Sequence, residues 1–410
     1  MNSSEAAMNG KGLDRRTLLK AAVALPLVLL RPQWLPELRA AENNGAGAGA
    51  GNRERLLLLV ELHGGNDGLN TLIPYAEAAY YQARPQLAIS RDQVRQLTPQ
   101  FGLHPALAPL MPFWKNKELA CLHGVGYPRP NRSHFRSIEI WETASDSEQV
   151  LDTGWLSRVF EQHPLPARFT AEGIVLGKGD SGPLSGGKAR TIALHDPGQF
   201  LQQAGSVRPA SLSTSNPALA HILEVQREIS QAASDLQGRI RQAPPLTSDF
   251  PANKIGKQLE VAAKLIAAQV PVAVIKVTQG SFDTHAGQSA THHRLLEELA
   301  QGLTTFRAAM EKLGAWKDVL VMTYSEFGRR VGENASHGTD HGTAAPHFFM
   351  GGRVKGGLYG VSPSLRDLQD GDLKHTLDYR AVYATVIEKW WGLPAVSFGT
   401  GRYPALDCLT

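Results

Sequence analysis

Residues 56–62 read LLLLVEL, and the segment HGGNDG follows directly at residues 63–68. An apolar run with a single charged residue predicts a strand that is buried on both faces, as in a parallel sheet. The glycines after it predict a tight turn whose backbone can come close to a ligand or an ion. Loops at the ends of parallel strands are where binding and catalytic groups gather, so this step from strand to loop points to a functional site.

Three more apolar runs lead into polar loops, at residues 119–125, 272–278 and 318–324. Amphipathic patterns lie between and after them. Strands that alternate with helices predict an α/β fold with a mainly parallel central sheet sandwiched by helices. The helices are expected at residues 135–143, 217–242, 255–269, 293–313 and 376–391.

The N-terminus has the features of a twin-arginine export signal. Arg15 and Arg16 precede an apolar run at residues 21–30 and a small-residue end near Ala40. That run is far shorter than the roughly 20 residues that span a bilayer, so a cleaved signal is favoured over a membrane anchor. We therefore expect a signal peptide at residues 1–41, the twin-arginine translocase as a transient partner, a periplasmic or secreted protein and no stable membrane span.

Composition fits a globular protein with a sizeable core. The chain has 410 residues, of which 42% are hydrophobic. The glycine- and alanine-rich residues 42–52 predict a flexible linker, and residues 53–410 a single domain. Only Cys121 and Cys408 are present, which excludes a disulfide framework and allows one bridge at most.

The charge balance gives no sign of nucleic-acid binding. The net charge is +4, and residues 1–40 hold six basic and three acidic residues, so the remainder carries about +1. The charge of the exported chain therefore does not suggest a nucleic-acid partner.

The loops after the four predicted strands carry carboxylates, imidazoles and a hydroxyl. Because the carboxyl ends of parallel strands share one edge of a sheet, we expect these groups to converge. Carboxylates with imidazoles and no thiolates suit zinc or manganese, with calcium or magnesium as alternatives. Neighbouring aspartates repel each other unless cations lie between them, which favours two divalent ions beside a serine nucleophile at a helix N-terminus. The residues are Asp67, Ser133, Asp283 and His285, and, within the segment 336–347, Asp340, His341 and His347.

Four motifs carry a family resemblance: HGGNDG at 63–68, SHFRSIEIWETA at 133–144, FDTH at 282–285 and SEFGR at 325–329. They are similar to those of a large bacterial family of unknown function that is exported by the twin-arginine route. The order of the motifs resembles that of the alkaline phosphatase and sulfatase superfamily, to which that family belongs. The resemblance implies an alkaline phosphatase-like fold.

The resemblance also implies roles for individual residues, with Ser133 as the nucleophile. One residue separates Asp283 from His285, where the superfamily usually has three, so His292 and His293 are alternatives to His285. Phe135 stands where sulfatases that form formylglycine have proline, which disfavours that chemistry. His337 is assigned to neither metal. The implied ligands are Asp67, Asp340 and His341 for one ion, and Asp283, His285 and His347 for the other.

Four further side chains are weaker hypotheses for substrate contacts: Arg132, Arg136, Arg329 and Glu326. Guanidinium groups bind phosphate and sulfate oxygens in pairs of hydrogen bonds. The leading interpretation is an exported, metal-dependent hydrolase of a phosphate or sulfate ester, carried on a small molecule or a polymer. The alternatives are a non-catalytic envelope interaction protein with the same fold, and a hydrolase or transferase that uses a single metal ion.

Overall fold

A computed structural model describes residues 55–177, 179–194, 234–236, 238–399 and 401–410. The expected export signal at residues 1–41 and linker at residues 42–52 lie outside the described residues. So does most of the helix expected at residues 217–242. These predictions therefore stay predictions.

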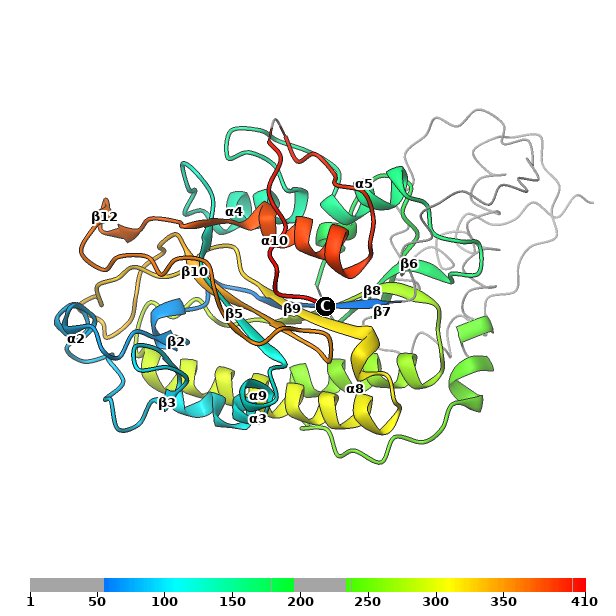
Figure 1. Ribbon diagram of the computed structural model, residues 1–410, viewed down its shortest axis with the longest axis horizontal. Coiled ribbons are helices and arrows are strands. Elements are labelled where there is room, and N and C mark those ends of the chain that lie inside the picture. The colour runs from blue at the N-terminus through cyan, green and yellow to red at the C-terminus, as the bar shows by residue number, and fades with distance from the viewer. Residues whose placement is uncertain (1–54, 178, 195–233, 237, 400) are drawn as a thin grey trace, which may run out of the picture.

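A nine-stranded sheet forms the middle layer of the described chain (Figure 1). The apolar run at residues 56–62 forms the inner strand β1. Strands far apart in the sequence lie on both sides of it. In order across the sheet, the strands are β11 (Gly357–Tyr359), β5 (Leu119–Gly126), β10 (Ala345–Met350), β9 (Val319–Tyr324), β1 (Leu56–Leu62), β8 (Val272–Gln279), β6 (Ala171–Leu176) and β7 (Thr191–Leu194), and β14 (Leu377–Asp378) pairs with β5.

The sheet is mainly parallel, as predicted. β1 runs parallel to both of its neighbours, β8 and β9. β10 is antiparallel to β9 and to β5, so β5 keeps the direction of β9. The carboxyl ends of β1, β5, β8 and β9 therefore lie on one edge of the sheet, where the sequence predicted that polar loops meet.

Helices cover both faces of the sheet (Figure 1). In β1, Leu58 and Val60 pack into the apolar layer on one side, and Leu57 and Leu59 into the layer on the other. Each buried leucine contributes about 1.5–3 kcal/mol, which explains why this strand is apolar on both faces. One layer contains α3 (Met111–Lys115), α8 (Lys254–Ala267) and α9 (Gln288–Lys312), and the other contains α4 (His134–Thr143), α5 (Trp155–Gln162) and α10 (Tyr379–Thr385).

Smaller elements connect these layers. Two small sheets flank the large one, with strand orders 2-4-3 and 12-13. The elements are α2 (Ala78–Ala83), β2 (Leu72–Ile73), β3 (Arg95–Gln96), β4 (Gly102–Leu103), β12 (Leu368–Gln369) and β13 (Asp372–Leu373), with the short helical turns η1 (Gly68–Asn70), η2 (Pro105–Leu110), η3 (Gly182–Leu184), η4 (Trp316–Asp318) and η5 (Val386–Trp390).

The helices predicted at residues 135–143, 255–269, 293–313 and 376–391 are observed close to those positions. The helix expected at residues 293–313 begins earlier, at Gln288, and the closing helix ends in a π-helical turn, η5. Among the described residues, none of the helices has the length and apolar composition needed to cross a bilayer. Cys121 and Cys408 are free, buried thiols in opposite apolar layers, so they do not pair.

One loop prediction was wrong. The segment from Ser336 to His347 is not loop to its end, because Ala345 begins β10 and His347 is inside that strand. Pro346 is the second residue of this strand. Proline is tolerated in a strand at a bulge, and the pairing of β10 with β5 shifts register between Ala345 and His347.

Candidate functional site

Two long loops at the carboxyl edge of the sheet are bonded to each other. The loop after β8 meets the loop after β9 where Thr339 N donates to Thr284 O at 3.1 Å and Gln288 N to His337 O at 2.9 Å. The second loop folds back on itself, since Arg330 N donates to Asp340 O at 3.0 Å. This backbone framework brings the side chains at 283–285 and 340–341 together.

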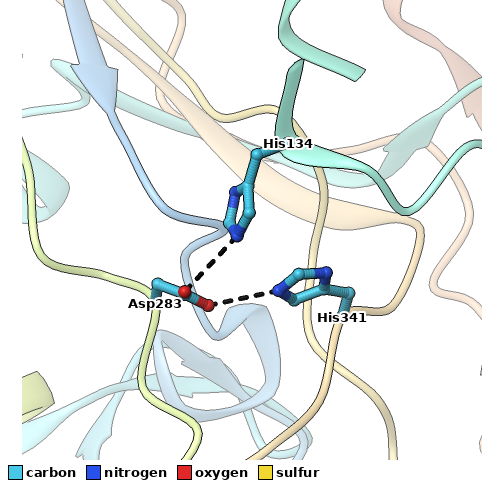
Figure 2. Close-up of side chains that lie close together, drawn as sticks. All are labelled: His134, Asp283 and His341. Carbon is cyan, nitrogen blue, oxygen red and sulfur yellow. Dashed lines mark hydrogen bonds and ion pairs between the residues drawn. The ribbon is translucent and has the colours of Figure 1, made fainter. Parts of the chain in front are cut away.

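Asp283 is the centre of a cluster with two imidazoles (Figure 2). His134 Nε2 lies 3.4 Å from Asp283 Oδ2, and His341 Nε2 lies 3.2 Å from Asp283 Oδ1. One potential ligand atom from each of the three residues lies within 4.8 Å of the others. A carboxylate with two imidazole nitrogens is a common ligand set for zinc.

His285 and Asp340 extend this cluster. His285 Nε2 lies 2.9 Å from both Asp283 Oδ1 and His341 Nε2, and its Nδ1 lies 3.1 Å from Asp340 Oδ1. Two facing Nε2 atoms cannot each donate a proton to the other. Several nitrogen and oxygen atoms that can bind a metal thus lie close together, with few protons to share among them. Such a group of atoms suits a cation.

Neighbouring groups select the tautomer of each imidazole. His134 Nδ1 lies 2.8 Å from the buried Glu326 Oε1, and His341 Nδ1 lies 2.7 Å from Arg132 O. Since both partners are acceptors, each Nδ1 is the ring nitrogen that donates to them, and Nε2 is the ring nitrogen that faces Asp283. Burial also lowers the pKa of His341, which favours its neutral form. Ligating histidines have the same arrangement, with one ring nitrogen bound to a protein acceptor and the other facing the metal.

Arg329 holds Asp283 in place. Its buried guanidinium donates to Gly65 O at 2.7 Å, to Thr339 O at 2.9 Å, to Phe282 O at 3.1 Å, and also to Gly64 O. It reaches Asp283 Oδ1 at 2.6 Å.

These contacts keep the carboxylate ionised. Partial burial works to raise the pKa of Asp283, but the hydrogen bond and charge of Arg329 outweigh it and lower the pKa to about 2. Because the guanidinium is buried and bonded to the protein, Arg329 is placed to position Asp283.

Asp67 and His347 lie in other surroundings. Asp67 is buried in an ion pair with Arg84, whose Nη1 is 2.5 Å from Oδ2, and Gln288 donates to the same oxygen. His347 is buried in β10, with its ring centroid 5.2 Å from that of Trp141, and burial lowers its pKa to about 3. The structure thus brings together Asp283, His285, Asp340 and His341 of the expected ligands, and it surrounds Asp67 and His347 with other groups.

Ser133 precedes His134 directly, at the N-cap position of α4. Its side chain is exposed and does not make the usual capping hydrogen bond to the helix. The hydroxyl therefore has no helix-capping role, and it belongs to the residue directly before His134 of the cluster.

The arginines on either side of Ser133 differ. Arg132 Nη2 lies 2.8 Å from Asp372 Oδ2. Arg136 donates to backbone carbonyls of the loop after α4, including Ser147 O at 3.1 Å, and pairs with Glu139 at 2.9 Å. Arg132 thus pairs with Asp372 in the wall of a cavity, whereas Arg136 holds the loop after α4 against its helix.

A cavity of about 470 Å³ adjoins the cluster, and its lining includes Arg132, Phe327 and Asp372. The Phe327 ring packs against the rings of His341 and His134, at centroid distances of 4.6 and 4.9 Å. Asp372 is buried, and burial raises its pKa. The cavity is large enough for the organic part of a small ligand, and Phe327 is the wall residue that contacts the cluster.

His134 is the cluster member that the sequence interpretation did not assign. It belongs to the quoted motif at residues 133–144, next to Ser133. Its place at the start of a helix after a buried strand is the signal that points to it. Sequence alone does not show which of two adjacent polar residues turns inward.

A family model described as "Protein of unknown function (DUF1501)" matches residues 98–397. No curated protein matches the chain. Its fold is similar to that of a protein in the alkaline phosphatase superfamily from Vibrio parahaemolyticus, with 10% identity, TM-score 0.39, and 93% of this chain and 76% of that chain covered. It is also similar to the C-terminal periplasmic domain of EcEptC from Escherichia coli in complex with Zn, with 9% identity, TM-score 0.39, and 86% and 87% covered.

A further similarity is to the lipoteichoic acid synthase LtaP from Listeria monocytogenes, with 10% identity, TM-score 0.38, and 88% and 76% covered. At these TM-scores the roles of individual residues rest on the side chains of this chain alone.

Proposed function

Because the chain belongs to this family of proteins of unknown function, we propose an activity from the site itself. The protein is a metal-dependent hydrolase of a phosphate or sulfate ester, with a divalent ion bound by His134, Asp283 and His341. Zinc or manganese suits this donor set best, because it combines imidazole with carboxylate.

The orientation of the two imidazoles carries this proposal. Glu326 and the carbonyl of Arg132 each accept the Nδ1 proton of one histidine. The Nε2 atoms of both rings then face an ionised carboxylate, and each offers a lone pair to a metal ion when its ring is neutral. In a structural hydrogen-bond network a proton lies between an imidazole nitrogen and a carboxylate oxygen. In a metal site both atoms must be free of that proton to bind the ion.

The arrangement favours one compact metal centre. His285 and Asp340 lie on its exposed side, where either can complete the coordination. The pairing of Asp67 with Arg84 makes Asp67 a poor ligand, because the arginine already balances its charge. His347 belongs to the core in this proposal.

When bound, the ion supplies a positive charge that stabilises the oxygens of the reacting phosphate or sulfate group. Ser133 supplies the attacking oxygen from the start of α4, next to His134. Arg329 fixes the orientation of Asp283, and Glu326 fixes that of His134. The adjoining cavity, with Arg132 and Phe327 in its wall, holds the alcohol part of the ester.

We also propose that the protein works outside the cytoplasm, after export through the twin-arginine signal at residues 1–41. The domain at residues 53–410 then folds as one unit behind the linker at residues 42–52. The proposal is supported by the sequence of the N-terminal segment, in which Arg15 and Arg16 precede a short apolar run.

The test is an activity panel on the mature chain, residues 42–410. Phosphomonoesters, phosphodiesters and sulfate esters are assayed with zinc, manganese, calcium or magnesium, and again with EDTA. We expect at least one ester class to be hydrolysed in a metal-dependent way. Replacing Ser133 with Ala is expected to lower kcat by about 10³-fold or more, while His337→Asn, on the exposed loop, leaves it unchanged. A wild type that hydrolyses none of these esters with any metal contradicts the proposal.

A further inference from the structure

An imidazole outside the metal cluster is also bound to a carboxylate at the same edge of the sheet. His63 is the first residue after β1, and its Nδ1 lies 3.0 Å from Glu61 Oε1. The His63 side chain is 52% exposed, whereas Glu61 is buried. With Nδ1 committed to the carboxylate, Nε2 is the ring nitrogen left to meet a ligand.

Glu61 is a rigid, ionised acceptor. Its other oxygen, Oε2, lies 3.0 Å from Lys276 Nζ and accepts a hydrogen bond from Thr278 Oγ1 at 3.0 Å. Burial works to raise the pKa of Glu61, but the charge of Lys276 and the hydrogen bonds outweigh it and lower the pKa to about 2. Glu61 thus keeps the proton on His63 Nδ1 and fixes the direction of the ring.

The backbone places Gly64, the residue directly after His63, beside the metal cluster, and Phe282 N donates to His63 O at 3.2 Å. Gly64 N donates at 2.8 Å to Glu326 Oε1, the same oxygen that holds His134. A Cβ atom at Gly64, where φ is +114°, would lie 2.5 Å from Asp283 N. The turn after β1 is therefore wedged between Glu326 and Asp283, and Figure 2 shows this blue chain passing next to the labelled side chains.

We infer that His63 is the general acid of the reaction proposed above, and that Glu61 is its positioning residue. This inference rests on the proposed hydrolase function. As the bond from Ser133 Oγ to phosphorus or sulfur forms, the bond to the leaving oxygen breaks, and its electron pair stays on that oxygen. The proton on His63 Nε2 moves to the leaving oxygen, His63 becomes neutral, and the hydroxyl proton of Ser133 passes to solvent.

The charge around His63 agrees with this role. The hydrogen bond to Glu61 raises the pKa of His63 to about 9, against partial burial, with help from the charge of Glu326 and against that of Lys276. His63 is therefore a cation at neutral pH and has a proton to give. Cationic hydrogen-bond donors also attract anionic esters.

Leaving groups of different acidity test the inference. A general acid contributes about 10²–10⁴-fold to rate when the leaving group is a poor one. His63→Gln is expected to lower kcat/KM at least 100-fold for an alkyl ester and less than about 5-fold for the matching 4-nitrophenyl ester, whose leaving group needs no proton. His337→Asn is the matched control, since it removes an exposed histidine whose φ of +55° suits asparagine.

A second readout does not depend on turnover. NMR titration of the histidine ring protons is expected to give a high pKa for His63 in the wild type, and a value close to the ordinary one, about 6.5, after Glu61→Gln. An equal loss of rate for alkyl and nitrophenyl esters in His63→Gln, or an unchanged pKa in Glu61→Gln, overturns the inference while the hydrolase proposal stands. A wild type that hydrolyses neither ester removes both.

Discussion

Replacing Arg329 with Met tests how the metal cluster is held. The guanidinium is buried and bonded to four backbone carbonyls and to Asp283. Methionine fills a similar volume but donates no hydrogen bond, so the carbonyls and the carboxylate lose their donor. Removing one partner of a buried pair costs about 3–5 kcal/mol, and because Asp283 is partly exposed we expect the low end, about 3 kcal/mol.

Two assays on purified protein measure the effect of Arg329→Met. Urea unfolding of the metal-free protein is expected to show the loss of about 3 kcal/mol. Zinc titration is expected to show an affinity lower by about 10–100-fold, because the group that orients a ligand is gone. The pKa of Asp283, now about 2, should rise towards that of an ordinary aspartate.

The neighbouring residue gives a matched control. The Arg330 side chain is 37% exposed, and Asp372, the one carboxylate that it pairs with in the described chain, lies 3.9 Å away. Arg330→Met should therefore change the unfolding free energy by no more than about 0.5 kcal/mol. If Arg329→Met is as stable as Arg330→Met and binds zinc as the wild type does, the positioning role of Arg329 is refuted.

Three more predictions concern groups outside the centre of the cluster. Arg84→Met should lower the unfolding free energy by about 3–5 kcal/mol in urea titrations but leave zinc affinity unchanged, and a changed zinc affinity would contradict the separation of Asp67 from the metal cluster. His347 takes up a proton near its ordinary pKa of 6.5 when unfolded but only near 3 when folded. Its contribution to stability is therefore lost as the pH falls from 6.5 towards 3, by up to about 1.4 kcal/mol per pH unit, and urea titrations at several pH values should show a shallower acid dependence for His347→Phe. Zinc at 100 times its Kd should stabilise the protein by about 2.7 kcal/mol, and EDTA should remove this gain in a thermal melt.

The fold was predictable because burial on both faces leaves a clear pattern. β1, β5, β8 and β9 lie where the apolar runs predicted them, and their parallel direction brings their loops to one edge. β10, one of the strands of the main sheet that the sequence did not predict, contains Pro346 at a bulge. A proline reads as loop unless the partner strand is known, so tertiary pairing decided this case.

The site was predictable in part, since loops after parallel strands share an edge. The sequence pointed to Asp283, His285, Asp340 and His341, which the structure brings together. It did not show that Arg84, 17 residues beyond Asp67, faces that carboxylate. Whether a charged side chain meets a partner from another helix or strand depends on how the elements pack. The spacing of residues in the sequence does not reveal this.

The inward turn of His134 has the same cause. Its position follows from the helix start and from Glu326, which comes 192 residues later in the chain. A polar residue at a helix N-terminus faces either solvent or the sheet edge, and the sequence pattern is the same for both.

Zinc binding by the wild type and by Asp283→Asn tests the central claim most directly. Isothermal titration calorimetry of the metal-free mature chain is expected to give at least one tight site. Asp283→Asn, nearly the same size but without the charge at the point where His134 and His341 meet, is expected to abolish that site. Asp152→Asn, the same change at an exposed residue far from the cluster in sequence, should bind as the wild type does. A wild type that binds no zinc and no manganese, or an Asp283→Asn variant that binds as tightly as the wild type, contradicts the account.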